Sequence, residues 1–180
     1  DHVLHEIAAN QNIKLVILTA AWAKSAVGTP YGAEDSGDVY LTDAAHPQRG
    51  STAQDRIVFA TGFERLIRAL AGKKVAIVSS LPEPGFEVPE TLAHIALTNS
   101  PVDTRPTLAQ FLARQKPVLD TFAAMKAHYG ATVVYPHLVL CASGRCEIER
   151  DGRALYRDSE HLTYPATWLM APLLMPLLGH

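Results

Sequence analysis

The sequence lacks any apolar stretch long enough to cross a bilayer. Its 180 residues contain no run close to the ~20 apolar residues that a membrane-spanning helix requires. The strongest candidate, WLMAPLLMPLL, is shorter and contains two prolines. The first residues also lack the basic flank and apolar centre of a signal peptide. They predict instead the end of an amphipathic helix, with Val3, Leu4 and Ile7 on one face, so we expect the printed sequence to begin inside a domain.

An excess of charge of one sign is also missing. The formal net charge is −2, and no cluster of Lys and Arg occurs, so the sequence offers no electrostatic footprint for nucleic acid. Hydrophobic residues make up 48% of the chain and charged residues 19%, which is typical of a globular domain and excludes disorder. We therefore expect one domain over residues 1–180 and no nucleic-acid partner.

Cysteine is scarce, because the chain has only Cys141 and Cys146. A zinc site would need two more ligands, and His137 alone is too few, so no metal site is predicted. A small disulfide loop is sterically reasonable because Gly144 permits the turn, and it would place the chain in an oxidising compartment. The alternative is a pair of buried free thiols in a cytosolic protein.

What the sequence does contain is an alternation of buried strands and amphipathic helices. Continuous apolar runs predict strands at Ile13–Ala20, Lys73–Ser80 and Ala131–Pro136, each covered on both faces. Helical periodicity fills the intervals, at Thr52–Ala71 and at Arg105–Gly130. This order predicts an α/β fold, a three-layer sandwich with a mostly parallel sheet.

Four further expectations concern interruptions and loops. Pro117 should kink the second long helix or split it in two, and prolines should interrupt a C-terminal helix that begins near Leu162. The polar, Gly-rich segment Val27–Gly50 is predicted to be a functional surface loop with a short strand at DVYLTD. In a parallel sheet, working residues lie beyond the carboxyl ends of the strands.

Two Asp-x-x-His sequences are candidates for acid–base chemistry. In each, a carboxylate can fix the tautomer of an imidazole and stabilise its protonated form. Asp158 follows a strand-like ALY and His161 is expected to open the C-terminal helix, so this pair has support on both sides. Asp43 and His46 lie in a polar loop without such support. A purely structural alternative makes Asp158 the N-cap of the helix.

No serine motif accompanies these pairs. Neither G-x-S-x-G nor G-D-S occurs, although Ser79 and Ser80 end a predicted strand. We interpret Ser36, in EDSGD, as a loop residue, because no strand precedes it and no helix follows. His137 follows the third strand and is a lesser candidate for the active edge.

The run CASGRC…ALYRDSEHLTYPAT, preceded by VVYPHLVLC, resembles the C-terminal end of the SGNH domains fused to acyltransferase family 3 membrane proteins. LVILTAAW resembles the family's strand that ends in Ala-Ala/Arg-Trp, and the resemblance extends from about Ile13 to Leu178. It implies an SGNH-hydrolase/flavodoxin-like fold in which Asp158 and His161 are two members of a Ser-His-Asp triad. It also implies that Trp22 lies at the active edge and binds substrate; the structural alternative is a partly buried cap over the sheet.

The chain departs from the family pattern at several positions. Thr163 replaces a serine, and Pro165-Ala166-Thr167 replaces a small Gly-Ala step, so the final helix should start later. The family's Gly-Asp-Ser block would precede Asp1, so the first strand and the nucleophilic serine are expected from an upstream segment. No Asn follows the strand before Trp22, which leaves one oxyanion donor unassigned.

The resemblance implies an activity as well as a fold. Family members are bacterial O-acetyltransferases, so the expected reaction is acyl transfer, most simply acetyl, to a hydroxyl of a cell-surface polysaccharide in the periplasm. No cofactor would bind directly; acetyl-CoA would be the ultimate donor through an attached or associated integral-membrane domain. The alternatives are an SGNH esterase that removes acyl groups, a non-catalytic glycan-binding or adaptor module, and a cytosolic flavodoxin-like ligand-binding domain.

Overall fold

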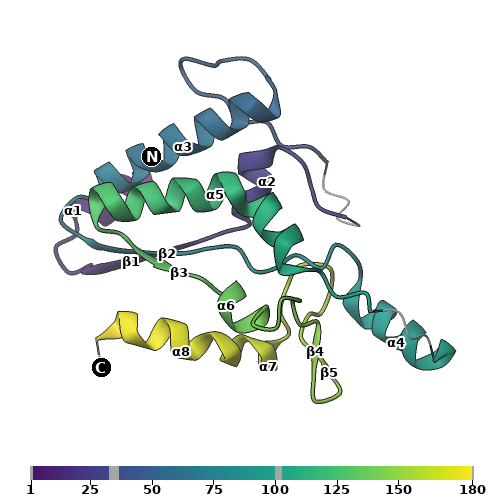
Figure 1. The fold of residues 1–180 in the computed structure, drawn as a ribbon. Helices are drawn as coiled ribbons and strands as arrows, with labels where there is room; N and C mark the ends of the chain where they lie inside the picture. The colour runs from purple at the N-terminus through teal and green to yellow at the C-terminus, as the bar shows by residue number, and fades with distance from the viewer. Residues whose placement is uncertain (1, 33–36, 100–102, 180) are drawn as a thin grey trace. The chain divides into compact units, whose positions relative to one another are not determined.

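The chain divides into two compact units whose segments alternate along the sequence. The computed structural model describes residues 2–32, 37–99 and 103–179 (Figure 1). Unit 1 comprises Asp1–Thr29, Asp38–Ser80 and Arg114–Val134, and unit 2 comprises Pro30–Gly37, Leu81–Ala113 and Tyr135–His180. The elements of unit 1 are α1 (His2–Ala9), β1 (Leu15–Thr19), α2 (Trp22–Val27), α3 (Thr52–Ala69), β2 (Lys74–Val78), most of α5 (Leu108–Tyr129) and β3 (Thr132–Val134). Those of unit 2 are the start of α5, α4 (Val88–Thr98), α6 (His137–Leu140), β4 (Glu149–Arg150), β5 (Arg153–Ala154), α7 (Tyr164–Thr167), η1 (Trp168–Met170), α8 (Ala171–Leu174) and η2 (Met175–Leu178).

A parallel sheet forms the frame of unit 1. Its strands lie in the order β1-β2-β3, and both pairings are parallel. Leu18 pairs with Ile77, and Val78 pairs with Val134. The predicted α/β class and all three predicted strands are confirmed. Coverage of β1 is less complete than its apolar sequence predicts, because Ile17 is 42% exposed.

Helices α3 and α5 lie over the same face of this sheet (Figure 1). They pack against it through aromatic side chains. Phe59 and Phe63 of α3 and Phe122 of α5 are buried in one cluster with Ile77 of β2. The first two lie four residues apart on the stripe that the sequence predicts for α3, which is the spacing of one helical face. Ser51 caps the start of α3, since its hydroxyl accepts a hydrogen bond from the Gln54 N–H.

Two local predictions for unit 1 are corrected by the structure, one of them only in part. Helix α5 runs through Pro117 as one helix, so it is not split in two, although it bends along its length (Figure 1). Proline in a helix interior costs about 3 kcal/mol, but Val118 and Phe122 are completely buried and each contributes roughly 1.5–3 kcal/mol, which offsets this cost. The DVYLTD stretch forms no strand, because its backbone is hydrogen-bonded elsewhere. The Val39 N–H donates to the Gly28 carbonyl oxygen, and the Leu41 N–H donates to Asp55 Oδ1.

Unit 2 has a separate core around the two cysteines. Cys141 and Cys146 form a disulfide with an S–S distance of 2.09 Å, which confirms the predicted pairing. Both pack in a buried cluster with Leu155 and Tyr156. The short strands β4 and β5 pair antiparallel through an Asp151-Gly152 turn. The C-terminal helix is divided among α7, η1, α8 and η2, as its prolines predict.

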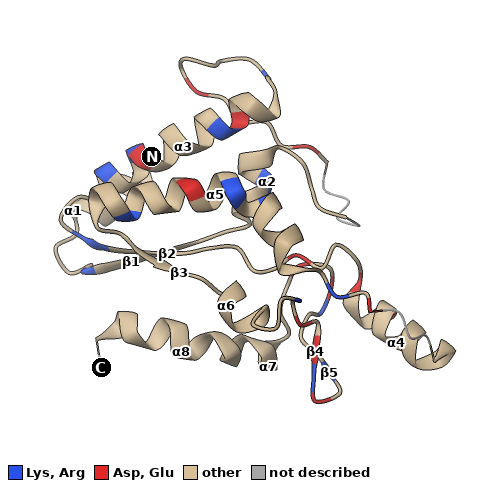
Figure 2. Cartoon of the chain, viewed as in Figure 1, with Lys and Arg blue, Asp and Glu red and all other residues tan. Residues whose placement is uncertain are grey.

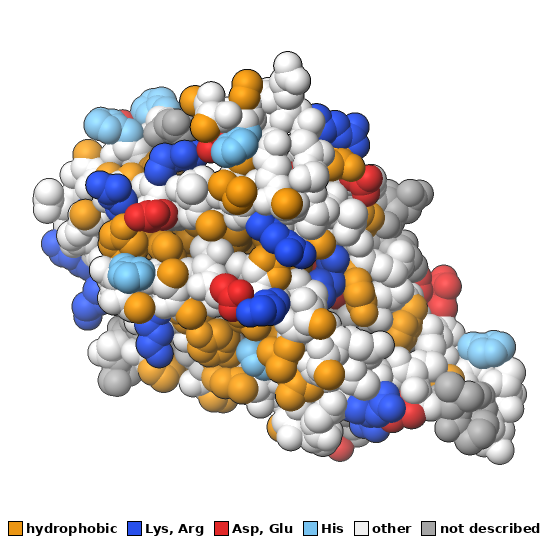
Figure 3. Space-filling view, turned by 45° about the horizontal axis from the view of Figure 1, so that its top comes forward, with side chains coloured by type: hydrophobic (Ala, Val, Ile, Leu, Met, Phe, Trp, Pro, Cys, Tyr) orange, Lys and Arg blue, Asp and Glu red, His pale blue; other side chains and the backbone are white. Residues whose placement is uncertain are grey.

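Charged side chains are distributed unevenly along the chain. Figure 2 shows both signs on β4 and β5 and neither sign on α7 and α8. On the face in Figure 3, described Lys and Arg side chains are interspersed with acidic and apolar ones. None of the helices among the described residues combines the length and apolar character that crossing a bilayer requires.

Candidate active site

The segment Leu155–Thr163 folds back on itself and presents Asp158 and His161 at its tip. Tyr156 and Leu162 form an antiparallel bridge. The Thr163 N–H donates to the Leu155 carbonyl oxygen at 2.8 Å, and the Arg157 N–H donates to the His161 carbonyl oxygen at 2.9 Å. Backbone bonds therefore close the loop that carries both candidate catalytic residues.

The carboxylate of Asp158 contacts both the backbone of its turn and the His161 ring, whose Nδ1 lies 3.1 Å from Oδ1. Oδ1 accepts hydrogen bonds from the backbone N–H groups of Glu160, at 2.9 Å, and His161, at 2.7 Å. Oδ2 lies 2.9 Å from His161 Nδ1 and 3.5 Å from Arg157 Nε. Two backbone donors thus fix the carboxylate, and the carboxylate fixes the imidazole ring.

The surroundings of Asp158 keep it ionised. Burial alone raises the pKa of this carboxyl, but the two backbone hydrogen bonds and the contact with the His161 ring outweigh burial, so its pKa is lowered. The His161 side chain is 56% exposed, and its Nδ1 faces the carboxylate. Its Nε2 is therefore the ring nitrogen placed to exchange a proton with another group.

The N-cap alternative for Asp158 is wrong. Helix α7 begins at Tyr164, and its cap is Thr163, whose hydroxyl oxygen accepts a hydrogen bond from the Ala166 N–H. His161 therefore lies in the turn and does not open the helix. The later helix start agrees with the expectation drawn from Pro165-Ala166-Thr167.

The second Asp-x-x-His sequence adopts a similar turn. His46 Nδ1 lies 3.0 Å from Asp43 Oδ1, and the same oxygen accepts the His46 N–H at 2.8 Å. The spacing alone therefore produces the carboxylate–imidazole contact and does not identify a catalytic pair. Asp43 and His46 lie in unit 1, within the Val27–Gly50 segment, whereas Asp158 and His161 lie in unit 2, where a cavity adjoins their turn.

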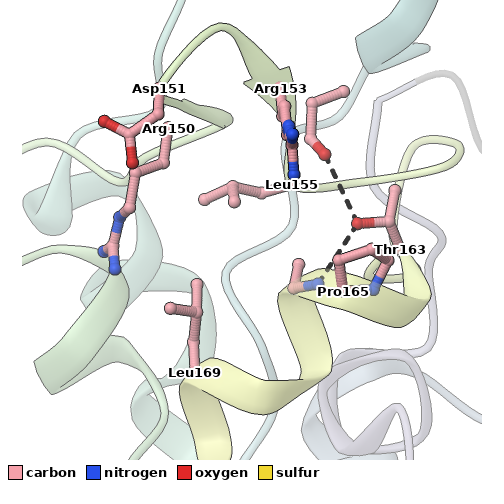
Figure 4. Close-up of a pocket in the computed structure, with 9 residues that line it drawn as sticks. Arg150, Asp151, Arg153, Leu155, Thr163, Pro165 and Leu169 are labelled. Carbon is pink, nitrogen blue, oxygen red and sulfur yellow. Dashed lines mark hydrogen bonds between the residues drawn. The ribbon is translucent and has the colours of Figure 1, made fainter.

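That cavity, of about 550 Å³, lies in unit 2 beside the base of the Leu155–Thr163 turn. Leu155 and Thr163, which flank the turn, line it together with Leu169. Arg150 and Arg153 line it from the β4–β5 hairpin, as Figure 4 shows. The Thr163 hydroxyl is held in place, since it donates to the Ala154 carbonyl oxygen at 3.3 Å and accepts from the Ala166 N–H at 3.4 Å (Figure 4).

Trp22 is placed in the core of unit 1. Its ring contacts Phe63 and Phe122 edge to face, with centroids 5.3 and 5.7 Å apart. Its indole N–H donates to the Val78 carbonyl oxygen at 2.8 Å. These contacts match the structural alternative of a partly buried cap over the sheet, and a role in substrate binding stays a prediction.

The other candidates differ in their surroundings. Ser79 and Ser80 are buried after β2, and neither hydroxyl has a hydrogen-bond partner within the described residues. His137 is 8% exposed, and burial lowers its pKa. Ser36 lies outside the described residues.

The β4–β5 hairpin, and with it the cavity, was not predicted from the sequence. The available signal was the Asp151-Gly152 dipeptide, which is a strong indicator of a tight hairpin. Both residues have positive φ, 52° and 72°, as the two central positions of a type I′ turn require. The anchor of the turn was not predicted either: the buried Tyr156 hydroxyl donates to the Pro82 carbonyl oxygen at 2.8 Å.

Comparisons with known proteins place these features in a family. A comparison with curated proteins gives no match. A solved structure entitled "Structure of Salmonella ser. Paratyphi A lipopolysaccharide acetyltransferase periplasmic domain" is similar in fold, with a TM-score of 0.53 and 13% identity. The match covers 78% of this chain and 56% of that one, so the chain spans little more than half of that domain. The model of the family "SGNH domain (fused to AT3 domains)" matches residues 1–176, and the chain therefore belongs to this family.

Proposed function

We propose that this domain transfers an acyl group, most simply acetyl, to a hydroxyl of a bacterial cell-surface polysaccharide. The observation that carries the proposal is the contact between Asp158 Oδ2 and His161 Nδ1 at 2.9 Å, in a turn closed by backbone bonds beside a cavity. Membership of a family fused to AT3 domains supports an acyl-transfer context. The structural neighbour's title, which names a lipopolysaccharide acetyltransferase, supports a polysaccharide acceptor.

The first half of the proposed reaction acylates a serine. A serine of a Gly-Asp-Ser block, supplied by a segment that precedes Asp1, attacks the carbonyl carbon of the acyl donor. His161 Nε2 takes the serine proton and then gives it to the leaving group as the donor's acyl bond breaks. Backbone N–H groups bind the negatively charged oxygen, and each such donor contributes roughly 3 kcal/mol in the transition state.

The second half returns the enzyme to its starting state. His161 takes a proton from a sugar hydroxyl, whose oxygen attacks the acyl carbon. The bond between the acyl group and the serine oxygen breaks, and His161 returns the proton to the serine. Throughout, Asp158 remains ionised and stabilises the protonated imidazole, which agrees with its lowered pKa.

The proposal also assigns a compartment and a partner. The neighbouring structure is named as a periplasmic domain, and the family description names a fusion to AT3 domains. We infer that the domain works in the periplasm next to an integral-membrane acyltransferase domain. That membrane domain would pass on acetyl groups that originate from acetyl-CoA.

The two Asp-x-x-His turns of the chain provide a test variant and a matched control. In the complete protein, His161→Ala should lower the turnover of an acetyl ester by at least about 10³-fold, because the proton acceptor is lost. His46→Ala is the control, since it removes the imidazole of the other Asp-x-x-His turn. Equal losses in both variants, or none in His161→Ala, would exclude His161 from the mechanism. Hydrolysis of the ester without transfer to any sugar would favour the esterase alternative.

A further inference from the structure

The cavity beside the Leu155–Thr163 turn has a mixed lining that indicates a particular kind of ligand. Leu155, Pro165 and Leu169 supply apolar surface (Figure 4). Asp151 and Arg153, both exposed, supply a carboxylate and a guanidinium at its edge. Binding sites for small molecules combine a mainly apolar wall with a few polar groups in this way, and a volume of about 550 Å³ falls in their usual range.

The charges around the cavity balance. Arg150 Nε lies 2.7 Å from Glu147 Oε2, so this arginine is already held by a carboxylate. Arg153 takes part in no ion pair or side-chain hydrogen bond within the part of the chain that the structure describes. Its positive charge is matched at the cavity by the negative charge of Asp151. An anionic ligand would gain one guanidinium but would also meet the Asp151 carboxylate, so the rim does not select for an anion.

A neutral sugar suits this combination. A sugar hydroxyl both donates and accepts hydrogen bonds, so neighbouring hydroxyls can accept from the Arg153 guanidinium and donate to the Asp151 carboxylate. The C–H faces of a pyranose ring can cover Leu155 and Leu169, whose side chains line the wall. The hydroxyl of Thr163 already has both a donor and an acceptor partner, which leaves the hairpin to supply the polar contacts.

The cavity lies close to His161 along the chain, which connects it with the proposed reaction. Leu155 and Thr163 line the cavity and are joined by a backbone hydrogen bond of 2.8 Å. His161 lies two residues from Thr163, which corresponds to roughly 7 Å of extended chain. A sugar chain that reaches from the cavity to the His161 ring would have to span about this distance.

We propose that the cavity between the β4–β5 hairpin and α7 is the acceptor subsite, and that it binds an uncharged saccharide unit through Asp151 and Arg153. This inference rests on the proposed function for the identity of the reaction, but the binding of a sugar can be measured separately. It places the glycan site at the β4–β5 hairpin of unit 2.

The test measures sugar binding to the complete protein by saturation-transfer NMR. The probes are neutral trisaccharides of glucose, galactose, mannose and N-acetylglucosamine, with a galacturonic acid trimer as the charged comparison. At least one neutral probe should bind, and Arg153→Gln and Asp151→Asn should each weaken it about ten-fold, as loss of a charge-assisted hydrogen bond predicts. Asn tolerates the positive φ of Asp151, so this variant keeps the turn.

Arg56→Gln is the control, because Arg56 is exposed on α3 of unit 1 and lies outside the cavity lining. The subsite is overturned if no neutral probe binds, if the acidic trimer binds more tightly, or if Arg56→Gln weakens binding as much as Arg153→Gln. Failure of the proposed function looks different: His161→Ala would keep full transfer activity, whatever the sugar affinities are.

Discussion

The buried hydroxyl of Tyr156 donates a hydrogen bond to the carbonyl oxygen of Pro82 at 2.8 Å. Tyr156 is 0% exposed, and Pro82 is among the most completely buried side chains of the chain. Burial raises the pKa of the phenol, so the group remains a donor at any ordinary pH. Asp158 follows Tyr156 by two positions, and this bond therefore ties the base of the Leu155–Thr163 turn to the 81–113 segment of unit 2.

Replacing Tyr156 with Phe should lower the free energy of unfolding by about 1–3 kcal/mol, because it leaves the Pro82 carbonyl oxygen buried without a partner. Urea titration measures this loss. Tyr164→Phe is the matched control, since Tyr164 is 78% exposed and should change stability by less than about 0.5 kcal/mol. Similar losses in the two variants would contradict the anchoring role.

The fold was predictable wherever one local signal acts alone. The apolar runs at Ile13–Ala20 and Lys73–Ser80 predict strands, because they are too short for a typical buried helix. The structure places β1 and β2 there. Pro117 was predicted less well because the penalty for a proline is local, whereas the burial that offsets it comes from side chains brought together by the tertiary fold.

The candidate site was predictable only in part, for a related reason. The spacing of Asp158 and His161 specifies their contact, because a short turn needs no help from elsewhere in the chain. The same spacing gives Asp43 and His46 the same contact, so the sequence cannot separate the two by geometry. The cavity depends on how the β4–β5 hairpin meets α7, and this arrangement is not encoded in any single stretch.

The start of the Val27–Gly50 segment provides a test of close packing. Gly28 has φ of 84°, and a Cβ built on it would overlap Asp55 Oδ2 and lie 3.1 Å from the Val39 carbonyl oxygen. Gly28→Ala should therefore lose about 2–4 kcal/mol of stability, from backbone strain and overlap together. Gly72 has φ of 88° but no atom within 4 Å of such a Cβ, so Gly72→Ala should show the strain alone, about 1 kcal/mol. Thermal unfolding of both variants separates the cost of backbone strain from the cost of steric overlap. Equal decreases in melting temperature would show that the overlap with Asp55 contributes nothing.

The disulfide between Cys141 and Cys146 should stabilise unit 2 modestly. Because it closes a short loop, replacing both cysteines with Ala should cost about 2 kcal/mol by the chain-entropy argument. Urea titration of the double variant beside the oxidised wild type measures the cost. Mass spectrometry without reductant should find the protein lighter by two hydrogens, and two free thiols would instead support the cytosolic alternative.

His137 is a buried histidine whose ring Nδ1 has no hydrogen-bond partner within the described residues. It lies between Phe111, with ring centroids 4.9 Å apart, and Tyr135, at 5.7 Å. This apolar environment disfavours the imidazolium, so burial lowers the pKa of His137 below its usual value of 6.5. Between the folded pKa and 6.5, the unfolded chain binds a proton that the folded chain does not bind.

The stability that depends on His137 should therefore be complete above pH 6.5 and decline as the pH falls toward the folded pKa, by at most about 1.4 kcal/mol per pH unit. His137→Phe keeps an aromatic ring between Phe111 and Tyr135 but cannot bind the proton, so its stability should decline less between pH 7.5 and 5.5. Urea titrations at the two pH values measure the difference. His94→Phe, at an exposed position of α4, is the control. If both variants reduce the decline equally, a buried neutral imidazole at position 137 is not its cause.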